Sequence, residues 1–308
     1  MKTAFLFPGQ GSQFSGMGKD FYDKYNEAKE VYDLANSITE MNVKELCFDE
    51  NEEELKETKN AQLAIATTSL AILAVIDKMK IKAEYAAGLS LGEYVALVYG
   101  GFLKLEDCFK LLKLRGYYMQ NLVPKKEYAM AAVIGLESNK IEEICKKHEE
   151  NGEFVVPANY NYSMQTVISG EKKAIENASK ELKEIGAKRV IELKTSGPFH
   201  TKALEEASKE FYKDLKKIEF QDGNEVKVIR NLNGEIYKAG DNFAEILSKH
   251  IINPVRFDKA LNIFQKENVD TFIEIGPGKS MTGFINKEKL EGTSISIQKV
   301  EDLEKLKV

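Results

Sequence analysis

The sequence contains few of the residues that build metal sites and disulfide frameworks. Three cysteines occur in 308 residues, and they show no spacing that is typical of zinc ligands. The three histidines are scattered along the chain. We therefore expect neither a structural metal nor a bound cofactor. An odd number of unpaired cysteines favours a reducing compartment, so we expect a cytoplasmic protein.

An excess of positive charge and a long hydrophobic run are also absent. The formal net charge is −5 at pH 7, which argues against general nucleic-acid binding because that requires a basic surface. The apolar run at residues 4–7 is too short for a signal peptide. The longest apolar stretch, residues 63–76, is too short to span a bilayer and contains Thr67, Thr68 and Ser69. We expect neither nucleic acid nor membrane as a partner.

Short apolar runs that alternate with helical patterns predict an α/β protein. Buried strands are expected at residues 2–7, 84–87, 226–229, 271–275 and 294–297. Helices are expected at residues 19–36, 61–79, 91–99, 105–122, 201–217, 241–252 and 258–268. A chain of this length can bury the core of one large domain or of two modest ones.

Residues 128–193 have a different pattern, which predicts a small inserted domain. Strands are expected at residues 128–136, 154–160, 165–169 and 188–193, and helices at residues 138–150 and 172–185. This order is the βαββαβ pattern of a ferredoxin-like domain. We expect it to occupy residues 124–197, between the two parts of a larger domain at residues 1–123 and 198–308.

The segment Gly88-Leu89-Ser90-Leu91-Gly92 is the strongest candidate for a reactive site. It reads G-x-S-x-G between an apolar run and a helical pattern, which is the context of a nucleophile elbow. The glycines permit a sharp turn, and the free N–H groups of the next helix would point at the atom that Ser90 attacks. A glycine-rich turn with a helix-capping serine is the structural alternative.

A serine nucleophile needs a base, and the three histidines are the candidates. His148 lies in a charged helix, and we expect a solvated, non-catalytic side chain there. His200 follows Gly197-Pro198 in a loop before a helix, where functional side chains are common. His250 lies on an apolar helix face, which is typical of a structural histidine. His200 is therefore the first candidate and His250 the second.

Arg115 borders the apolar stripe of the helix expected at residues 105–122. A guanidinium near a buried face costs free energy unless an anion pairs with it. No carboxylate lies one turn away on the same helix. A snorkelling side chain or a tertiary salt bridge would explain this position. A bidentate clamp for a substrate carboxylate would explain it equally well.

Several further motifs resemble those of acyl-carrier-protein acyltransferases, in the same order and over nearly the whole chain. Besides the Ser90 motif, they are Phe7-Pro8-Gly9-Gln10-Gly11-Ser12-Gln13, Leu114-Arg115-Gly116 with Met119-Gln120, Ala158-Asn159-Tyr160-Asn161 with Gln165 and Ile168-Ser169-Gly170, Gly197-Pro198-Phe199-His200, Asn253-Pro254-Val255, and Ile275-Gly276-Pro277-Gly278. The chain is most similar to the free-standing bacterial malonyl-CoA:acyl-carrier-protein transacylases of fatty acid synthesis. The resemblance implies an α/β-hydrolase-like large domain that carries the ferredoxin-like insert.

The resemblance also implies catalytic roles. Ser90 would be the nucleophile and His200 its base. The backbone N–H groups of Gln10 and Leu91 would form the oxyanion hole. Arg115 would bind the malonyl carboxylate, which would supply the missing anion.

The resemblance implies further substrate contacts as well. Phe199 precedes the histidine, as in related domains that select malonyl over methylmalonyl groups. Gln165 and Arg189 match family positions near the CoA entrance. Leu89 stands where histidine is usual, at a position without a catalytic role. His250 stands where glutamine is usual, and we expect its neutral ring to accept the N–H of His200.

The implied reaction is a ping-pong acyl transfer from malonyl-CoA to acyl carrier protein, with malonyl-Ser90 as intermediate. A thiol with a pKa near ~8.5 leaves easily, so we expect the base to need no buried carboxylate behind it. The small domain carries positive charges suited to an acidic carrier protein, at Lys172, Lys173, Lys188 and Arg189. For Lys172 and Lys173 a merely solvated charged surface is the alternative. The alternatives are a serine esterase or thioesterase on a similar fold, and a non-catalytic docking module for carrier proteins.

Overall fold

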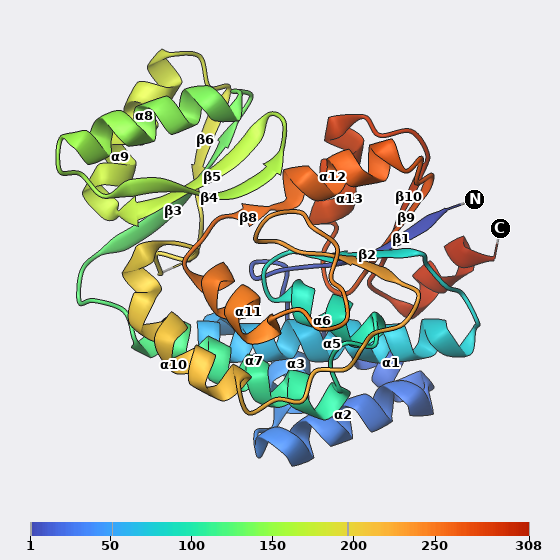
Figure 1. Ribbon diagram of the computed structural model, residues 1–308. Helices are drawn as coiled ribbons and strands as arrows, with labels where there is room; N and C mark the ends of the chain where they lie inside the picture. Colours follow the sequence, from blue (N-terminus) through green and yellow to red (C-terminus); the bar gives the residue numbers. More distant parts are fainter. Residues whose placement is uncertain (1, 51, 196, 308) are drawn as a thin grey trace.

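The computed structural model describes residues 2–50, 52–195 and 197–307. Two five-stranded sheets organise these residues, and Figure 1 shows them as separate parts of the molecule. One sheet, with most of the helices around it, forms the larger part. The other, covered by two helices, forms the smaller part at the upper left of Figure 1. The α/β architecture expected from the sequence is confirmed.

The larger sheet is parallel and has the order β10-β9-β1-β2-β7. Its strands are β1 (Thr3–Phe7), β2 (Tyr85–Gly88), β7 (Lys227–Ile229), β9 (Thr271–Ile275) and β10 (Thr293–Ile297). Phe7 pairs with Gly88 at the carboxyl ends of β1 and β2. The loop after β1 and the turn that carries Ser90 therefore start side by side, at the sheet edge where α/β proteins bind ligands.

Helices cover both faces of this sheet because alternate residues of β1 point to opposite sides. Phe5 and Phe7 pack in one apolar cluster, whereas Ala4 and Leu6 pack in another. The first cluster includes residues of α2 (Asn26–Thr39), α5 (Thr58–Lys78), α6 (Gly92–Tyr99), α7 (Leu105–Asn121), α10 (Glu205–Leu215) and α11 (Phe243–Ile251). The second includes residues of α12 (Phe257–Lys266) and α13 (Ser280–Glu288). Figure 1 shows these two sets on opposite sides of β1 and β2.

Helix α5 is the central helix of the larger part. Among the described residues it is the one helix long and apolar enough to cross a membrane, but 89% of its apolar window is buried inside the protein. It packs between α2 and α7, so its hydrophobicity is that of a core helix.

The second sheet forms from the βαββαβ segment, as predicted. Its elements are β3 (Tyr128–Ile134), α8 (Ser138–Glu150), β4 (Val155–Tyr162), β5 (Gln165–Glu171), α9 (Lys172–Glu184) and β6 (Arg189–Glu192). The strand order is β6-β3-β5-β4-β8. The last strand, β8 (Val255–Arg256), comes from a later part of the chain and runs parallel to β4. It ties the two parts together, and the domain limits at residues 124 and 197 stay a prediction.

Several local features differ from the predictions. The helix expected at residues 19–36 is divided into α1 (Lys19–Lys24) and α2, because Tyr25 has an extended backbone. The two-residue strand β8 and four helical elements were not predicted; the helical elements are α3 (Val43–Phe48), α4 (Glu52–Lys56), α13 and a final 3₁₀ helix, Val300–Leu306. Segments this short offer about two and a half turns or fewer, too little for a clear apolar period.

Candidate functional site

Ser90 lies in a sharp turn between β2 and α6, as the elbow motif predicted. Its φ is +57°, in the left-handed region that serine rarely adopts. The flanking glycines are required because the backbone folds back on itself. A Cβ at Gly88 would lie 1.9 Å from the backbone carbon of Gly92, and a Cβ at Gly92 would lie 2.1 Å from the carbonyl oxygen of Phe7.

The structure brings Ser90 and His200 together. The Oγ of Ser90 lies 2.8 Å from Nε2 of His200, and His200 is buried. The Nδ1 of His200 lies 2.9 Å from the backbone carbonyl oxygen of His250. This carbonyl can only accept a hydrogen bond, so Nδ1 carries the hydrogen and Nε2 is free to take the proton of Ser90.

The prediction that the ring of His250 accepts the N–H of His200 is wrong. The backbone of His250 is the acceptor, and the two rings instead stack with their centroids 4.8 Å apart. The physical reason is the position of His250 in the last turn of α11. Carbonyl groups in the last turn of a helix lack an intrahelical partner and are available to other donors.

Burial lowers the pKa of His200 well below its ordinary value of 6.5. The low-polarity surroundings disfavour the charged ring, and the neighbouring His250 and Arg115 lower this pKa further. His200 is therefore an uncharged base at neutral pH.

Arg115 is completely buried in α7. Its Nη1 donates to Oε1 of Gln62 at 2.6 Å, and its Nη2 donates to Oγ of Ser90 at 3.0 Å. The guanidinium lies over the ring of Tyr94, 5.5 Å from the centroid. No carboxylate among the described residues lies within ion-pair distance, and burial lowers the pKa of Arg115. Neither a snorkelling side chain nor a tertiary salt bridge explains this arginine.

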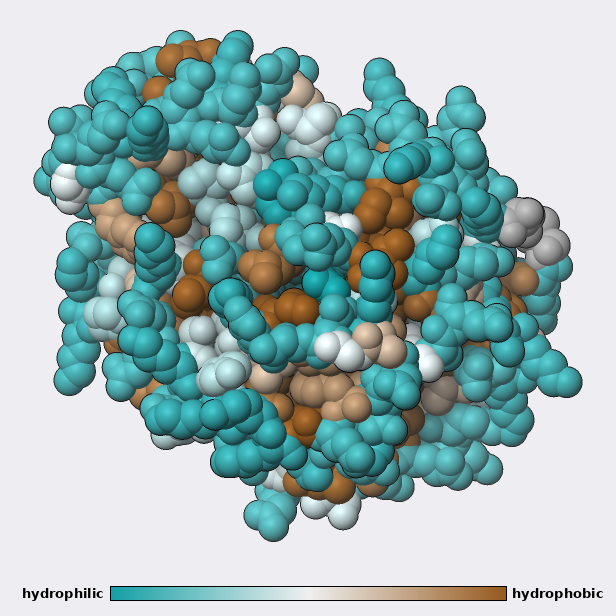
Figure 2. Space-filling view, viewed as in Figure 1, coloured by the Kyte–Doolittle hydropathy of each residue, from teal (hydrophilic) through white to brown (hydrophobic). Residues whose placement is uncertain are grey.

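A cavity of about 300 Å³ opens onto Ser90 and His200 between the two sheets. Its walls include Gln10, Phe199 and Gln165, which the sequence had singled out. Figure 2 shows apolar side chains gathered in the middle of one face of the molecule, between the smaller part and the helices of the larger part. Phe199 is 6% exposed and lines the same cavity as Ser90.

Gln10 and Leu91 flank the elbow. The loop after β1 packs closely against it, since a Cβ at Gly9 would lie 2.6 Å from the carbonyl oxygen of Leu89. The side chain of Gln10 donates to Thr58 at 3.0 Å and holds this loop in place. Within the described parts of the chain, the backbone N–H groups of Gln10 and Leu91 have no hydrogen-bond acceptor. They are free to donate to an oxyanion, a role that stays a prediction.

Three residues around the elbow were given no role at the sequence level: Asn231, Glu93 and Tyr237. Asn231 accepts from the backbone N–H of Ser90 and donates to the carbonyl of Gly88, both at 2.7 Å. Glu93 is fully buried and accepts from the backbone N–H of Asn231 and from the hydroxyl of Tyr237. Glu93 could have been noticed as the one acid in an otherwise apolar helix, whereas no sequence pattern marks Asn231.

The four basic residues that the sequence analysis assigned to the small domain lie at two separate places. Gln165 begins β5, and Lys172 follows the other end of that strand. Lys172 and Lys173 therefore lie at the far end of the small sheet from the cavity. Lys188 and Arg189 line a second cavity of about 540 Å³, together with Lys279 and Lys287. This cavity shares Gln165, Ser280 and Phe284 with the one that contains Ser90.

The expected solvated position of His148 is also wrong. Its side chain is only 12% exposed and is held between the carboxylates of Glu153 and Glu181. The charged pattern of α8 hid this arrangement because Glu181 comes from the adjacent helix α9. His148 does not line the cavity at Ser90.

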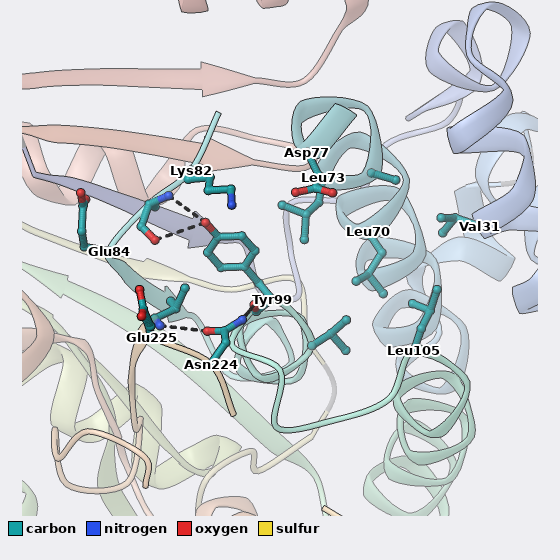
Figure 3. A pocket seen from close by; sticks show the side chains of 14 residues that line it. Val31, Leu70, Leu73, Asp77, Lys82, Glu84, Tyr99, Leu105, Asn224 and Glu225 are labelled. Carbon is teal, nitrogen blue, oxygen red and sulfur yellow. Dashed lines mark hydrogen bonds between the residues drawn. The ribbon is translucent and has the colours of Figure 1, made fainter. Parts of the chain in front are cut away.

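A larger cavity lies elsewhere. It has a volume of about 690 Å³ and is bordered by Tyr99, Asp77 and Glu84, as Figure 3 shows. Glu84 directly precedes β2, whereas Ser90 follows the end of this strand. This cavity is therefore at the opposite end of the sheet and takes no part in the candidate site.

Comparison with known proteins gives consistent matches over the whole chain. The acyl transferase domain family matches residues 4–298. The malonyl CoA-acyl carrier protein transacylase of Bacillus subtilis (strain 168) is 40% identical over 303 residues, which are 98% of this chain and 95% of that protein. The protein of the same description from Staphylococcus aureus (strain MRSA252) is 36% identical and covers 98% of this chain and 97% of its own length.

Solved structures agree with these sequence matches. The crystal structure of a malonyl CoA-acyl carrier protein transacylase from Clostridium perfringens has a TM-score of 0.94 at 40% identity, covering 99% of this chain and 96% of that one. A malonyl-transacylase in complex with a type II PKS acyl-carrier protein has a TM-score of 0.94 at 32% identity, covering 98% of both chains.

Proposed function

This chain belongs to the malonyl CoA-acyl carrier protein transacylase family of acyl transferases, and on that premise we propose that Ser90 carries the malonyl group between the two substrates. The activity is the transfer of malonyl from malonyl-CoA to acyl carrier protein in fatty acid synthesis. One observation carries the proposal. A single hydroxyl, that of Ser90, lies 2.8 Å from a buried base and 3.0 Å from a buried, unpaired guanidinium.

In the first half-reaction Ser90 attacks the thioester carbonyl of malonyl-CoA while its proton moves to Nε2 of His200. The hydrogen bond from Nδ1 of His200 to the carbonyl of His250 keeps the ring oriented as the charge develops. The backbone N–H groups of Gln10 and Leu91 stabilise the tetrahedral oxyanion. The carbon–sulfur bond then breaks, and the CoA thiol leaves with the proton from His200.

In the second half-reaction the phosphopantetheine thiol of acyl carrier protein gives its proton to His200 and attacks the malonyl ester. The ester bond to Ser90 breaks, and Ser90 takes the proton back. A thiol has a pKa near ~8.5, so it is readily deprotonated by a neutral imidazole and leaves easily in the reverse direction. This explains why His200 works with a backbone carbonyl behind it instead of a carboxylate.

Arg115 selects the acyl group. Among the described residues its two terminal nitrogens donate only to neutral oxygens, those of Gln62 and Ser90. A carboxylate can take the place of these oxygens and accept two charge-assisted hydrogen bonds. The free carboxylate of a malonyl ester on Ser90 is two carbons from the ester oxygen, within reach of this guanidinium. An acetyl group has no such anion and leaves the buried charge unpaired.

The second cavity is the entrance for both thiol substrates. Four cations line it, none of them in an ion pair with another described residue: Lys188, Arg189, Lys279 and Lys287. They suit the phosphates of CoA and an acidic carrier protein. Further in, Asn161 is 5% exposed with an unpartnered Oδ1 in the wall of the Ser90 cavity, where it can accept from a pantetheine amide. We place the enzyme in the cytoplasm, where its three free, buried cysteines stay reduced.

Intact-mass measurement tests the covalent step. Wild-type protein mixed with malonyl-CoA should gain one malonyl group, keep it, and lose it when holo acyl carrier protein is added. Ser90→Ala should show no adduct, because the elbow glycines remain but the nucleophile is gone. Rapid release of free malonate would identify an esterase, and absence of any adduct would identify a docking module.

Charge reversal tests the entrance. Lys279→Glu with Lys287→Glu should raise the KM for carrier protein in a salt-dependent manner. Lys172→Glu with Lys173→Glu is the matched control at the other end of β5, and it should change this KM less. A larger effect of the control pair would indicate that carrier protein binds at that end of the small sheet.

A further inference from the structure

Glu93 is a fully buried carboxylate one turn of backbone beyond the nucleophile. A buried charge costs free energy unless it is well compensated. One of its oxygens, Oε1, accepts from the backbone N–H of Asn231 at 3.0 Å and from the hydroxyl of Tyr237 at 2.9 Å. These two donors belong to the same segment after β7, so Glu93 fixes this segment against α6.

Asn231 connects this fixed segment to the elbow. Its side chain accepts from the N–H of Ser90 and donates to the carbonyl of Gly88, both at 2.7 Å. Ser90 has a φ of +57°, a conformation that persists only where the surroundings hold it. The backbone position of Asn231, set by Glu93, therefore helps to hold the backbone of the turn that carries Ser90.

The other oxygen of Glu93 faces the ring of His250, which stacks on the ring of His200. Its Oε2 lies 2.9 Å from Nδ1 of His250, which is the distance of an ion pair, although the alignment is outside that of a hydrogen bond. His250 is 1% exposed, and its backbone carbonyl accepts from His200 while its ring stacks on that of His200. Glu93 thus also sets the position of the helix end that orients the base.

We propose that Glu93 is a positioning residue for the acyl transfer, because one buried carboxylate holds on one side the segment that fixes Ser90 and on the other the helix end that fixes His200. The proposal rests on the roles proposed above for Ser90 and His200. Its consequence is that the 2.8 Å contact between nucleophile and base depends on a side chain that touches neither substrate nor reacting atoms. Misplacement of reacting groups by about 1 Å can cost about 100-fold in rate.

The experiment compares Glu93→Ala, Glu93→Gln and Glu274→Ala. Glu274 is the matched control, because it is also fully buried and accepts hydrogen bonds from two backbone N–H groups and one hydroxyl, but these belong to α13. Each variant is assayed for folding by circular dichroism and for kcat and KM of malonyl loading. The rate of Ser90 sulfonylation by a sulfonyl fluoride is also measured, since this reagent has neither a carboxylate nor a CoA group.

Glu93→Ala should lower kcat about 10–100-fold, as for other residues that orient a functional ligand, with KM unchanged within about twofold. Sulfonylation should slow in parallel. Glu93→Gln keeps an oxygen for both donors and an N–H for the side of His250, so it should recover most of the rate. Glu274→Ala should lower the melting temperature but not kcat.

A folded Glu93→Ala variant with wild-type kcat, or one in which only KM changes, would overturn the proposal. A Glu93→Gln variant as slow as Glu93→Ala would also overturn it, because the hydrogen bonds alone would not hold the site. If Glu93→Ala does not fold, Glu93→Asp replaces it; this residue keeps the charge but is too short to contact both sides, and it should lower kcat at constant KM. Malonyl loading by Ser90→Ala would instead refute the assignment of the nucleophile, whatever the Glu93 variants do.

Discussion

Two buried arginines in this protein have opposite surroundings. Arg230 is 8% exposed and contacts the carboxylates of Glu235 and Asp241. Arg115 is 0% exposed, and among the described residues its terminal nitrogens donate hydrogen bonds only to the neutral oxygens of Gln62 and Ser90. Both guanidiniums also lie over a tyrosine ring, Tyr237 or Tyr94.

The difference separates a structural cation from a binding cation. The charge of Arg230 is neutralised within the chain, so this residue stabilises the fold around the segment after β7. Among the described residues no carboxylate lies within ion-pair distance of Arg115, which supports its proposed role in binding an anion that arrives beside Ser90. A buried guanidinium without an ion-pair partner costs stability, and the proposed binding of a substrate carboxylate would offset this cost.

The largest expected effect comes from giving Arg115 an internal partner like those of Arg230. In Gln62→Glu, a carboxylate would replace the amide oxygen that lies 2.6 Å from Nη1. Loading of malonyl should fall about 10–100-fold, because a charged contact worth about 1.5–3 kcal/mol is already occupied. Rapid-quench measurement of the malonyl-enzyme burst checks this, with Gln62→Met as the uncharged control. Equal burst rates in the two variants would mean that the new charge does not compete with substrate.

Removing a carboxylate partner of Arg230 should lower stability and leave malonyl loading nearly unchanged. Asp241→Asn should lower the free energy of unfolding by about 1–3 kcal/mol, less than for a completely buried pair because Asp241 is partly exposed. The loading rate should stay within about threefold of wild type, since substrate contacts are unchanged. Urea denaturation and burst kinetics give both quantities. A loss of malonyl selectivity in this variant would erase the distinction between the two arginines.

The charge of Arg115 should also be visible in the pH dependence. The pKa of His200 lies well below 6.5, mainly through burial and in part through His250 and Arg115. His200 therefore stays uncharged from neutral pH down to its lowered pKa. We expect kcat/KM to be flat from neutral pH to below 6.5 and to fall only at more acidic pH. In Arg115→Ala the pKa of His200 should rise, and the acidic limb should move to higher pH.

This shift is measured with acetyl-CoA, which does not need the arginine. An acidic limb that stays in place or moves to lower pH would be inconsistent with a charged Arg115 beside His200. The lowered pKa of His200 also affects stability. As pH falls below 6.5 the unfolded chain binds a proton at this histidine before the folded protein does, so the free energy of unfolding decreases.

The smallest effect concerns the part of the acyl group that Arg115 does not contact. Phe199→Ser should increase the use of methylmalonyl-CoA several-fold relative to malonyl-CoA, because the ring lines the cavity beside Ser90. One methyl group usually changes such discrimination by only about 1–3 kcal/mol. Competition assays with both thioesters measure the ratio. No gain at all would place this selectivity in other residues of the cavity.

The sequence predicted the elements with strong local patterns. The elbow at Ser90, the βαββαβ order and the loop position of His200 depend on glycine spacing and apolar periods, which are local properties. It could not predict contacts that arise when distant segments meet. Asn231 reaches Ser90, and the backbone of His250 reaches His200, only because α11 and the segment after β7 pack against the elbow. A periodicity cannot reveal that a backbone carbonyl, and not the ring of His250, is the acceptor.

The positions of the basic residues could not be predicted for the same reason, since they depend on how distant segments pack. Lys172 and Lys188 are close in sequence, but they lie near opposite ends of β3, since Tyr128 pairs with Glu171 and Ile134 pairs with Arg189. Conversely, Lys279 and Lys287 are far away in sequence and line the same cavity as Arg189.

The most direct test of the central claim, that Arg115 is kept unpaired for the malonyl carboxylate, is the ratio of kcat/KM for malonyl-CoA and acetyl-CoA in Arg115→Ala. Arg230→Ala is the matched control. The ratio should fall at least about tenfold in Arg115→Ala, since a charge-assisted contact of about 1.5–3 kcal/mol is lost for malonyl alone. It should stay at the wild-type value in Arg230→Ala. An unchanged ratio in Arg115→Ala would contradict the account.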